Sequence, residues 1–251
     1  KPRLVSVRNG RVSPLNDGVD GQAQLQVVWQ GETVEVPVEV SGQKQPDPVA
    51  FKYETLAAMT KQGCNAGSCH GSPDGKGGFS LSLFAFDPVH DTESLVRGGL
   101  NRRVNVFAPL ESLMLKKPLL RVPHVGGKRL RPTDAAFMIL KQWISEGARP
   151  DRDGAPTCEK IVVHPGPSRV LTGADATQQL SVFAHFTDGT VRDVTRLATF
   201  DTSHRDIATI DADGRVTGQS RGQAAITVRF LEHLESVYLT FVEEVEGFEW
   251  P

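Results

Sequence analysis

The chain has 251 residues, enough for two or three domains, and its 39% hydrophobic and 23% charged residues are typical of a globular protein. Lys and Arg number 28 and Asp and Glu 30, so the net charge of −2 argues against general binding of nucleic acid or anionic membranes. The sequence has no apolar run of the roughly 18 residues that a membrane-spanning helix needs, no signal-peptide core in its first ten residues, and too few cysteines, three, for a disulfide scaffold.

Polar stretches at residues 42–48 and 149–156 separate two strand-rich flanks from a helical middle part. The predicted domains are the last strands of a truncated Ig-like β-sandwich at residues 1–45, a helical domain at 46–156, a complete Ig-like β-sandwich at 157–243 and an acidic linker at 244–251. The predicted fold class is therefore multidomain, α plus all-β.

The first part repeats the end of the last part. Residues 9–13, 21–27 and 34–38 align with residues 213–217, 222–228 and 237–241. Half a sandwich leaves an apolar face and a sheet edge uncovered. We therefore expect the chain to begin inside a domain, or another chain to supply the missing strands. A short hairpin packed on a neighbouring domain is the alternative. Larger domains are expected to be missing from both ends, since residues 243–251 form an acidic tail with no terminating pattern.

The middle part contains the residues with recognisable chemistry. Cys64 and Cys69 are five positions apart, and His70 follows directly. In the related C-x-x-C-H motif, two thiols bond the vinyl groups of haem and the histidine ligates the iron. Because the porphyrin fixes the vinyl positions, the two extra residues here must bulge, and residues 66–68 are small enough to do so. The spacing favours one covalently attached haem c.

Three other interpretations of these cysteines stay open. They are a Cys64–Cys69 disulfide, a zinc site that uses both thiols and His70, and buried free cysteines. Zinc is disfavoured because Cys69 and His70 are adjacent and cannot easily turn to one tetrahedral ion, and because no second cysteine pair follows. The third cysteine, Cys158, has no assigned role.

Helical spacing surrounds the motif on both sides. Residues 53–62 lead into it, and a closing helix is predicted from a cap at Thr133 and Asp134 to Glu146, with a stop at Gly147. The apolar stripe of the closing helix consists of Ala136, Phe137, Leu140, Trp143 and Ile144. This order of a leading helix, a haem motif and a closing helix resembles class I cytochromes c.

A closer resemblance is to the planctomycete-type cytochrome c domains of large exported proteins, which share the widened C-x4-C-H motif. The residues that match are 63–71, 75–84, 87–88, 101–103, 109, 111–113, 123–124, 126–129, 143–144 and 146–148. The resemblance covers about residues 49–150. It implies a neighbouring Ig-like module and larger domains downstream.

Iron on His70 would need a sixth ligand or an open site. The candidates are Met59, Met114, Met138, His90 and His124. Met59 and Met138 are expected in the core, Met114 in an apolar helical turn and His90 in a polar turn. Pro123 and Gly126-Gly127 flank His124, which stands where class I cytochromes c present the distal ligand. We therefore predict that His70 and His124 ligate the iron, with Met114 as the alternative to His124.

Residues 97–131 carry nine basic residues and one acidic residue, a local net charge of +8. The residues predicted to neutralise the two haem propionates are Arg102, Arg103, Lys128 and Arg129. The remaining positive charge would attract an acidic redox partner protein or an anionic polysaccharide. The Gly-rich residues 75–78 are predicted to form a turn near the haem edge.

The last part alternates apolar and polar residues, so that Leu180, Val182, Ala184 and Phe186 would share one face of a strand. Turn residues at 187–190 and 213–214 separate about seven short strands, as in an Ig-like β-sandwich. Residues 222–228 have the ending G-x-A-x-I-x-V, and residues 21–27 have it with Leu25 in place of isoleucine. Both segments resemble bacterial Ig-like domains of group 2, which are spacers or adhesion elements of exported proteins.

Together these patterns predict an electron-transfer module of the c-type cytochromes, not an enzyme, in a multidomain protein of the periplasm or the cell exterior. Two alternatives remain. One is a haem enzyme or gas-binding sensor with an open or Met-ligated site, and the other is a haem-free surface protein with an adhesive or structural role.

Overall fold

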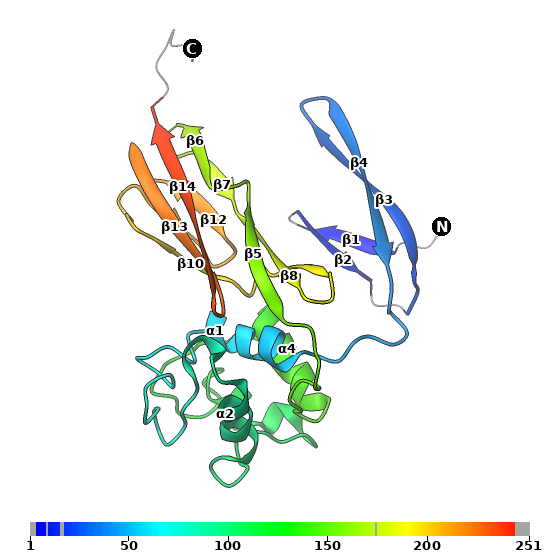
Figure 1. Cartoon of the computed structure of the whole chain (residues 1–251), viewed down its shortest axis with the longest axis vertical. Coiled ribbons are helices and arrows are strands. Elements are labelled where there is room, and N and C mark those ends of the chain that lie inside the picture. Colours follow the sequence, from blue (N-terminus) through cyan, green and yellow to red (C-terminus); the bar gives the residue numbers. More distant parts are fainter. Residues whose placement is uncertain (1–3, 9, 16–17, 174, 244–251) are drawn as a thin grey trace. The chain divides into compact units, whose positions relative to one another are not determined.

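The computed structural model describes residues 4–8, 10–15, 18–173 and 175–243. The chain forms two compact units, Lys1–Pro48 and Val49–Pro251. Strands β1 to β4 belong to the first unit, and the helices together with β5 to β14 belong to the second (Figure 1). Asn9 of the predicted repeat and the predicted acidic linker at 244–251 lie outside the described residues.

The first unit consists of two antiparallel hairpins. Strand β1 (Val5–Arg8) pairs with β2 (Arg11–Pro14), and β3 (Gly21–Trp29) pairs with β4 (Glu32–Val40). The second hairpin turns through Gln30 and Gly31, whose φ angles are both positive, at 48° and 87°. Two positive φ angles are typical of the primed turns that match the twist of paired strands.

The β3–β4 hairpin has the same register as the hairpin of β13 (Gly222–Phe230) and β14 (His233–Val242). Leu25 lies opposite Val36, as Ile226 lies opposite Val237. The predicted alignment of residues 34–38 with 237–241 is therefore wrong by two positions. A shift of two keeps every side chain on its own face, so alternation cannot reveal it. The equal two-residue turns decide the register instead.

Most apolar side chains of the first unit are exposed. Val28 is 65% exposed and Trp29 73%, whereas Val40 is the one hydrophobic residue that is buried among those described in this unit. This exposure agrees with the uncovered apolar face that was expected for an incomplete sandwich. That these strands belong to an incomplete sandwich stays a prediction.

The second unit begins with a helical segment. The π-helical stretch η1 (Phe51–Leu56) continues into α1 (Ala57–Lys61), where a leading helix was predicted, and α1 packs against the closing helix α4 (Ala135–Ser145). The short helices between them are η2 (Leu83–Ala85), α2 (Pro88–Thr92), η3 (Glu93–Arg97), η4 (Pro109–Glu111) and α3 (Leu113–Lys116). Loops therefore make up most of the segment between α1 and α4.

Helix α4 confirms the predicted apolar stripe and corrects two details. All five stripe residues are buried, and Gly147 follows the helix with a φ of 100°. Asp134 occupies the N-cap position, but its carboxylate accepts a hydrogen bond from the backbone N–H of Arg131 instead of capping the helix. Met138, predicted to be core, is 56% exposed. It follows Phe137 and is turned about 100° from it around the helix, away from the buried stripe.

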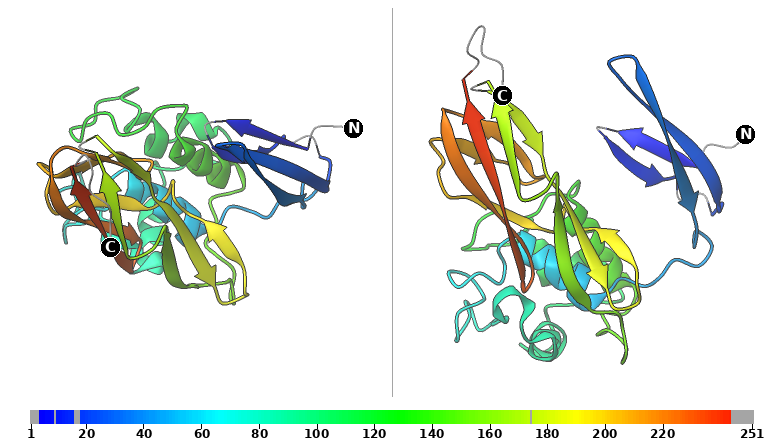
Figure 2. Two further views of the ribbon diagram at one scale, coloured as in Figure 1. Left: turned by 90° about the horizontal axis from the view of Figure 1, so that it is seen from above. Right: turned by 45° about the horizontal axis from the view of Figure 1, so that its top comes forward.

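Residues 158–242 form the predicted β-sandwich. The strands are β5 (Cys158–His164), β6 (Ser168–Thr172), β7 (Thr177–Gln179), β8 (Ser181–Phe186), β9 (Val191–Asp193), β10 (Thr199–Thr202), β11 (Ala208–Ile210), β12 (Arg215–Gly218), β13 and β14. They form sheets in the orders β10-β13-β14-β6, β11-β12-β7 and β5-β8-β9, which Figure 2 shows from two further directions. The predicted face of Leu180, Val182, Ala184 and Phe186 is buried.

The described part of the sandwich has ten strands, β5 to β14, against about seven predicted, and one of the unpredicted strands is β7. Strand β7 pairs with β12, whereas β8, which follows after Leu180 alone, pairs with β5. The predicted alternating run begins at Leu180, and β7 (Thr-Gln-Gln) lies directly before it. Three polar residues carry no strand pattern, so the pairing of β7 depends on the neighbouring strand that it meets.

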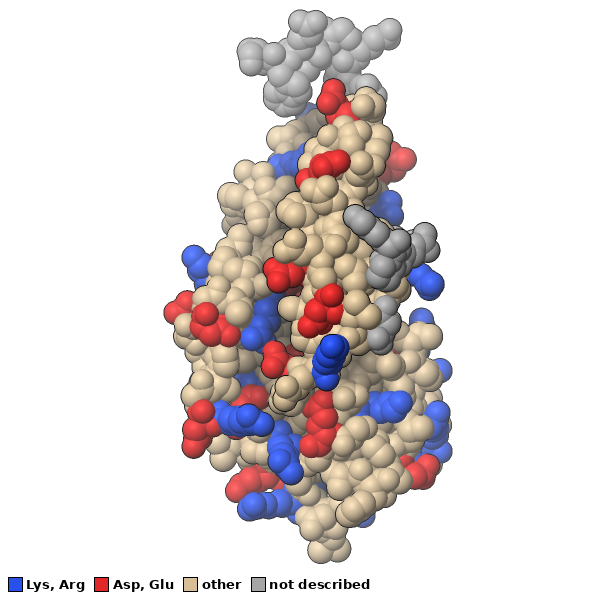
Figure 3. Space-filling view, turned by 90° about the vertical axis from the view of Figure 1, so that its right-hand side faces the viewer, with Lys and Arg blue, Asp and Glu red and all other residues tan. Residues whose placement is uncertain are grey.

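The helical segment and the sandwich pack together within the second unit. The Tyr53 ring lies 5.2 Å from the ring of Phe186 and 6.2 Å from that of Phe230, between centroids. Lys52 Nζ forms an ion pair of 2.7 Å with Glu232 Oε1. The predicted boundary after residue 156 marks the change from helices to strands, while both sides share one core. Figure 3 shows Lys and Arg side chains interspersed with Asp and Glu on the face that it presents.

Candidate functional site

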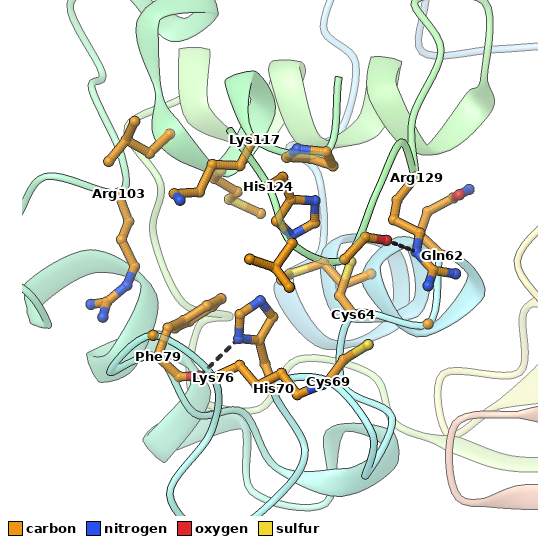
Figure 4. Close-up of a pocket in the computed structure, with 18 of the residues that line it drawn as sticks. Gln62, Cys64, Cys69, His70, Lys76, Phe79, Arg103, Lys117, His124 and Arg129 are labelled. Carbon is orange, nitrogen blue, oxygen red and sulfur yellow. Dashed lines mark hydrogen bonds between the residues drawn. The ribbon is translucent and has the colours of Figure 1, made fainter. Parts of the chain in front are cut away.

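A cavity of about 560 Å³ opens in the helical segment. Cys64, Cys69, His70 and His124, which the sequence predicted to act together, all line it. Figure 4 shows the His124 ring facing the His70 ring across the cavity, with the two cysteine side chains to one side. The residues that line the cavity include no Asp or Glu. The volume lies within the range of small-molecule and cofactor sites.

The loop of the cysteine motif is held by its own backbone hydrogen bonds. The N–H of Cys64 donates to Met59 O at 3.0 Å, and the N–H of His70 donates to Cys64 O at 3.0 Å. Gly67 and Ser68, within the predicted bulge, are exposed. Gly71 closes the loop where a Cβ atom would lie 2.1 Å from Asn65 O. The widened motif is thus compact at its ends and open to solvent in its middle.

The thiols of Cys64 and Cys69 are free, so the structure contains no disulfide between them. Burial, together with a smaller effect of Cys69, raises the pKa of the Cys64 thiol to about 12. The sulfur is therefore a neutral thiol at pH 7. Within the described residues, no group of three His, Cys, Asp or Glu side chains is placed to hold a metal ion by itself.

The His70 ring is fixed in one tautomer. Its Nδ1 lies 2.9 Å from the carbonyl oxygen of Phe79, and because a carbonyl only accepts, Nδ1 must carry the proton. Nε2 then holds a lone pair and can act as a metal ligand. Burial lowers the pKa of His70, the hydrogen bond to Phe79 opposes this, and repulsion from His124 lowers the pKa further. The net lowering of the pKa favours a neutral imidazole that is ready to ligate.

His124 is held in the same way. Its Nδ1 lies 2.8 Å from the carbonyl oxygen of Gly127, which again leaves the lone pair on Nε2. A Cβ atom on Gly126 would lie 3.0 Å from His124 Cε1, so the glycine leaves room for the ring. Gly127 adopts a φ of 74°, which disfavours other residues. Gly126 and Gly127 therefore shape the loop that presents His124.

The other candidate ligands are distributed differently. Met59 is buried and Met114 half-buried, and both line the cavity. Met138 points away, as described for α4. His90 is exposed in α2, where its Nε2 lies 3.3 Å from Ser80 Oγ. The cavity therefore offers His124 and two methionines opposite or beside His70, and it excludes Met138 and His90.

Five basic side chains line the cavity, and they only partly match the prediction. Arg102, Arg103 and Arg129 were predicted, whereas Lys76 and Lys117 were not. Lys128 does not line this cavity and borders a separate groove near the start of α4. Lys117 lies within the basic segment and Lys76 within the Gly-rich turn, so both carried a weak signal. Their convergence depends on how the loops fold.

Comparison with known proteins identifies the sandwich. The fold defines an Ig-like β-sandwich beside a helical segment with a cofactor-sized cavity. The family model of the bacterial Ig-like domain (group 2) matches residues 165–230, within that sandwich. Domains of this family occur in bacterial surface proteins. No curated protein matches the chain. Among the described residues, the structure contains no helix with the length and apolar character to cross a membrane.

Proposed function

We propose that this chain is a c-type cytochrome module that transfers electrons in an exported bacterial protein. The observation that supports this most is the convergence of two thiols and two imidazoles on one cavity lined by basic and apolar residues without a carboxylate. Haem would supply a one-electron iron centre when bound. In this proposal Cys64 and Cys69 form the two thioethers, His70 is the proximal ligand, and His124 is the sixth ligand.

The donor set fits this group. In the neutral ring each imidazole has Nε2 available as a ligand, because each Nδ1 donates to a backbone carbonyl. The neutral thiols can add to vinyl groups once activated. A second imidazole would give a lower reduction potential than the thioether of Met114, and six-coordinate iron resists substrate binding. These properties favour electron transfer over haem enzyme chemistry or gas sensing.

Basic side chains suit the two propionates of a haem. Arg102, Arg129, Lys76 and Lys117 line the cavity, and all four are exposed enough to reorient toward a carboxylate. Charge-assisted hydrogen bonds from Arg to a carboxylate are among the strongest polar contacts in proteins. Positive charge that the propionates leave uncompensated would attract an acidic redox partner protein or an anionic polysaccharide.

The proposal is tested by expressing the chain together with a haem-attachment system. We expect a low-spin absorption spectrum that carbon monoxide leaves unchanged, and an intact mass that exceeds the polypeptide by one haem. Cys64→Ala should remove one thioether and Cys158→Ala should remove none, because Cys158 lies in β5, outside the cavity. A colourless polypeptide of unmodified mass would leave the bacterial Ig-like domain as the only assigned feature and favour a structural or adhesive role.

A second pair of variants identifies the sixth ligand. His124→Ala should open the iron to carbon monoxide, whereas Met114→Leu should leave the spectrum unchanged. The opposite result would assign Met114 as the ligand and raise the expected potential. A carbon monoxide shift in the unmodified protein would instead indicate an open site, as in a haem enzyme or gas sensor.

A further inference from the structure

Arg103 is a buried arginine whose hydrogen bonds go to backbone carbonyls. It is 9% exposed. Its Nη1 donates to Ser94 O at 2.9 Å and its Nη2 donates to Gly78 O at 2.6 Å. Burying a charged group is costly unless its hydrogen bonds are made. The side chain thus joins η3 to the loop that follows the cysteine motif.

The chain leaves a slot for this guanidinium. A Cβ atom on Gly98 would lie 2.4 Å from Arg103 Nη1, and one on Gly99 would lie 3.0 Å from the same atom. Two consecutive glycines therefore provide the space that the side chain fills. Ser94 ties η3 to the same loop, because its hydroxyl donates to Ser80 O at 2.6 Å. Residues 78–80 are held from both ends.

Phe79 connects Arg103 to His70. Arg103 Cζ lies 4.7 Å from the centre of the Phe79 ring, which is cation–π distance. The Phe79 ring lies 4.5 Å from the His70 ring, between centroids, and Phe79 O is the acceptor for His70 Nδ1. Arg103 thus binds the carbonyl of the residue before Phe79 and also packs on the Phe79 ring.

We propose that Arg103 is a positioning residue for the His70 imidazole: it holds Phe79 so that the ring of His70 keeps its proton on Nδ1 and presents Nε2 to the cavity. The proposal rests on the proposed function only in treating His70 as an iron ligand. It gives Arg103 a role besides the predicted propionate contact, because two of the five N–H donors of the guanidinium are bonded within the protein. A hydrogen bond from the second nitrogen of a ligating histidine raises its basicity as a ligand.

The first experiment uses the full chain expressed without haem attachment, and reads the His70 tautomer from imidazole ¹⁵N chemical shifts. The wild type should show the Nδ1–H form. Arg103→Lys keeps the charge but not the forked pair of donors, and the ratio of Nδ1–H to Nε2–H should fall about fivefold, as expected for one weakened hydrogen bond. Phe79→Leu keeps the carbonyl but removes the ring, and should lower the ratio by less.

The matched control is Arg97→Lys, because Arg97 is exposed in the same part of the chain and lies outside the cavity. It should leave the ratio unchanged. If Arg103→Ala does not fold, Arg103→Lys decides the question. An Arg103→Lys variant that folds and keeps the wild-type ratio would overturn the proposal, whether or not the chain binds haem.

The second experiment uses the haem-loaded chain. Weaker donation from Nδ1 makes His70 a poorer ligand for ferric iron, so Arg103→Lys should have a higher reduction potential than the wild type and than Arg97→Lys. An equal potential in Arg103→Lys and Arg97→Lys would overturn the positioning role. If no variant and no wild-type chain acquires haem, the proposed function fails while the tautomer measurement still decides the role of Arg103.

Discussion

At the scale of single residues, two glycines of the cysteine motif differ sharply in their surroundings. A Cβ atom on Gly71 would lie 2.1 Å from Asn65 O and 2.8 Å from Leu83 Cδ2, whereas the nearest atom to one on Gly67 would be 4.0 Å away. Gly71→Ala should therefore lower the free energy of unfolding by about 1–3 kcal/mol, the usual cost of forcing extra atoms into a packed site. Denaturant unfolding of Gly71→Ala and of the wild type measures this loss of stability.

Gly67→Ala is the control, since Gly67 is exposed and has an ordinary backbone conformation. Its free energy of unfolding should match that of the wild type within about 0.5 kcal/mol. Equal destabilisation by both variants would contradict the compact loop. The haem content of Gly71→Ala, compared with that of Gly67→Ala, then reports whether the loop geometry matters for attachment.

The motif itself was predictable from sequence, because Cys64, Cys69 and His70 are adjacent in the chain and their chemistry is local. The hydrogen bond that holds each histidine ring was not predictable from sequence. The Nδ1 of His70 donates to a carbonyl nine positions away, and the guanidinium that supports it comes from Arg103. Such contacts depend on how loops cross in space, and no periodic pattern of residue types records them.

At the scale of elements, α4 shows which part of a helix supports the core. Leu140 is 2% exposed and Met138 is 56% exposed on the same helix. Leu140→Ala should lower the free energy of unfolding by about 2–5 kcal/mol through lost burial and a residual cavity. Met138→Ala should cost less than about 0.5 kcal/mol. Thermal unfolding compares the two, and a large loss for Met138→Ala would contradict the orientation of α4.

Helix and strand periodicity predicted the type of these elements better than their limits. The stripe of α4 and the alternation of β8 are strong local signals, and the structure confirms both. Strand β7 and the register of β4 were missed. Both depend on pairing with other strands, and a period of two reads the same before and after a shift of two residues.

At the scale of the whole second unit, Lys61 links the helical segment to the sandwich. Its Nζ donates to the carbonyl oxygens of Ala198 and Ala212 and lies 4.8 Å from the centre of the Phe200 ring. Burial lowers the pKa of Lys61 to about 8, against an opposing effect of Asp213 and Asp211. A single α1 side chain thus has its charge state determined by the sandwich.

This link gives a pH dependence with a definite sign. Between about pH 8 and pH 10.5, Lys61 binds a proton in the unfolded chain but not in the folded one. The free energy of unfolding should therefore rise with pH across this window, relative to a Lys61→Met variant that cannot titrate. Denaturant titrations of both proteins from pH 7 to pH 10.5 test it. Parallel profiles would show that Lys61 titrates normally in the folded protein.

Residue order alone determined the spacing of Cys64, Cys69 and His70, the apolar stripe of the closing helix and the Ig-like character of the last part, since each depends on neighbouring or periodically spaced residues. Tertiary structure decided that His124 faces His70, that Lys76 and Lys117 join the cavity while Lys128 does not, and that the helical segment shares a core with the sandwich. These features join residues separated by tens of positions, and only the packing of loops and sheets brings them together.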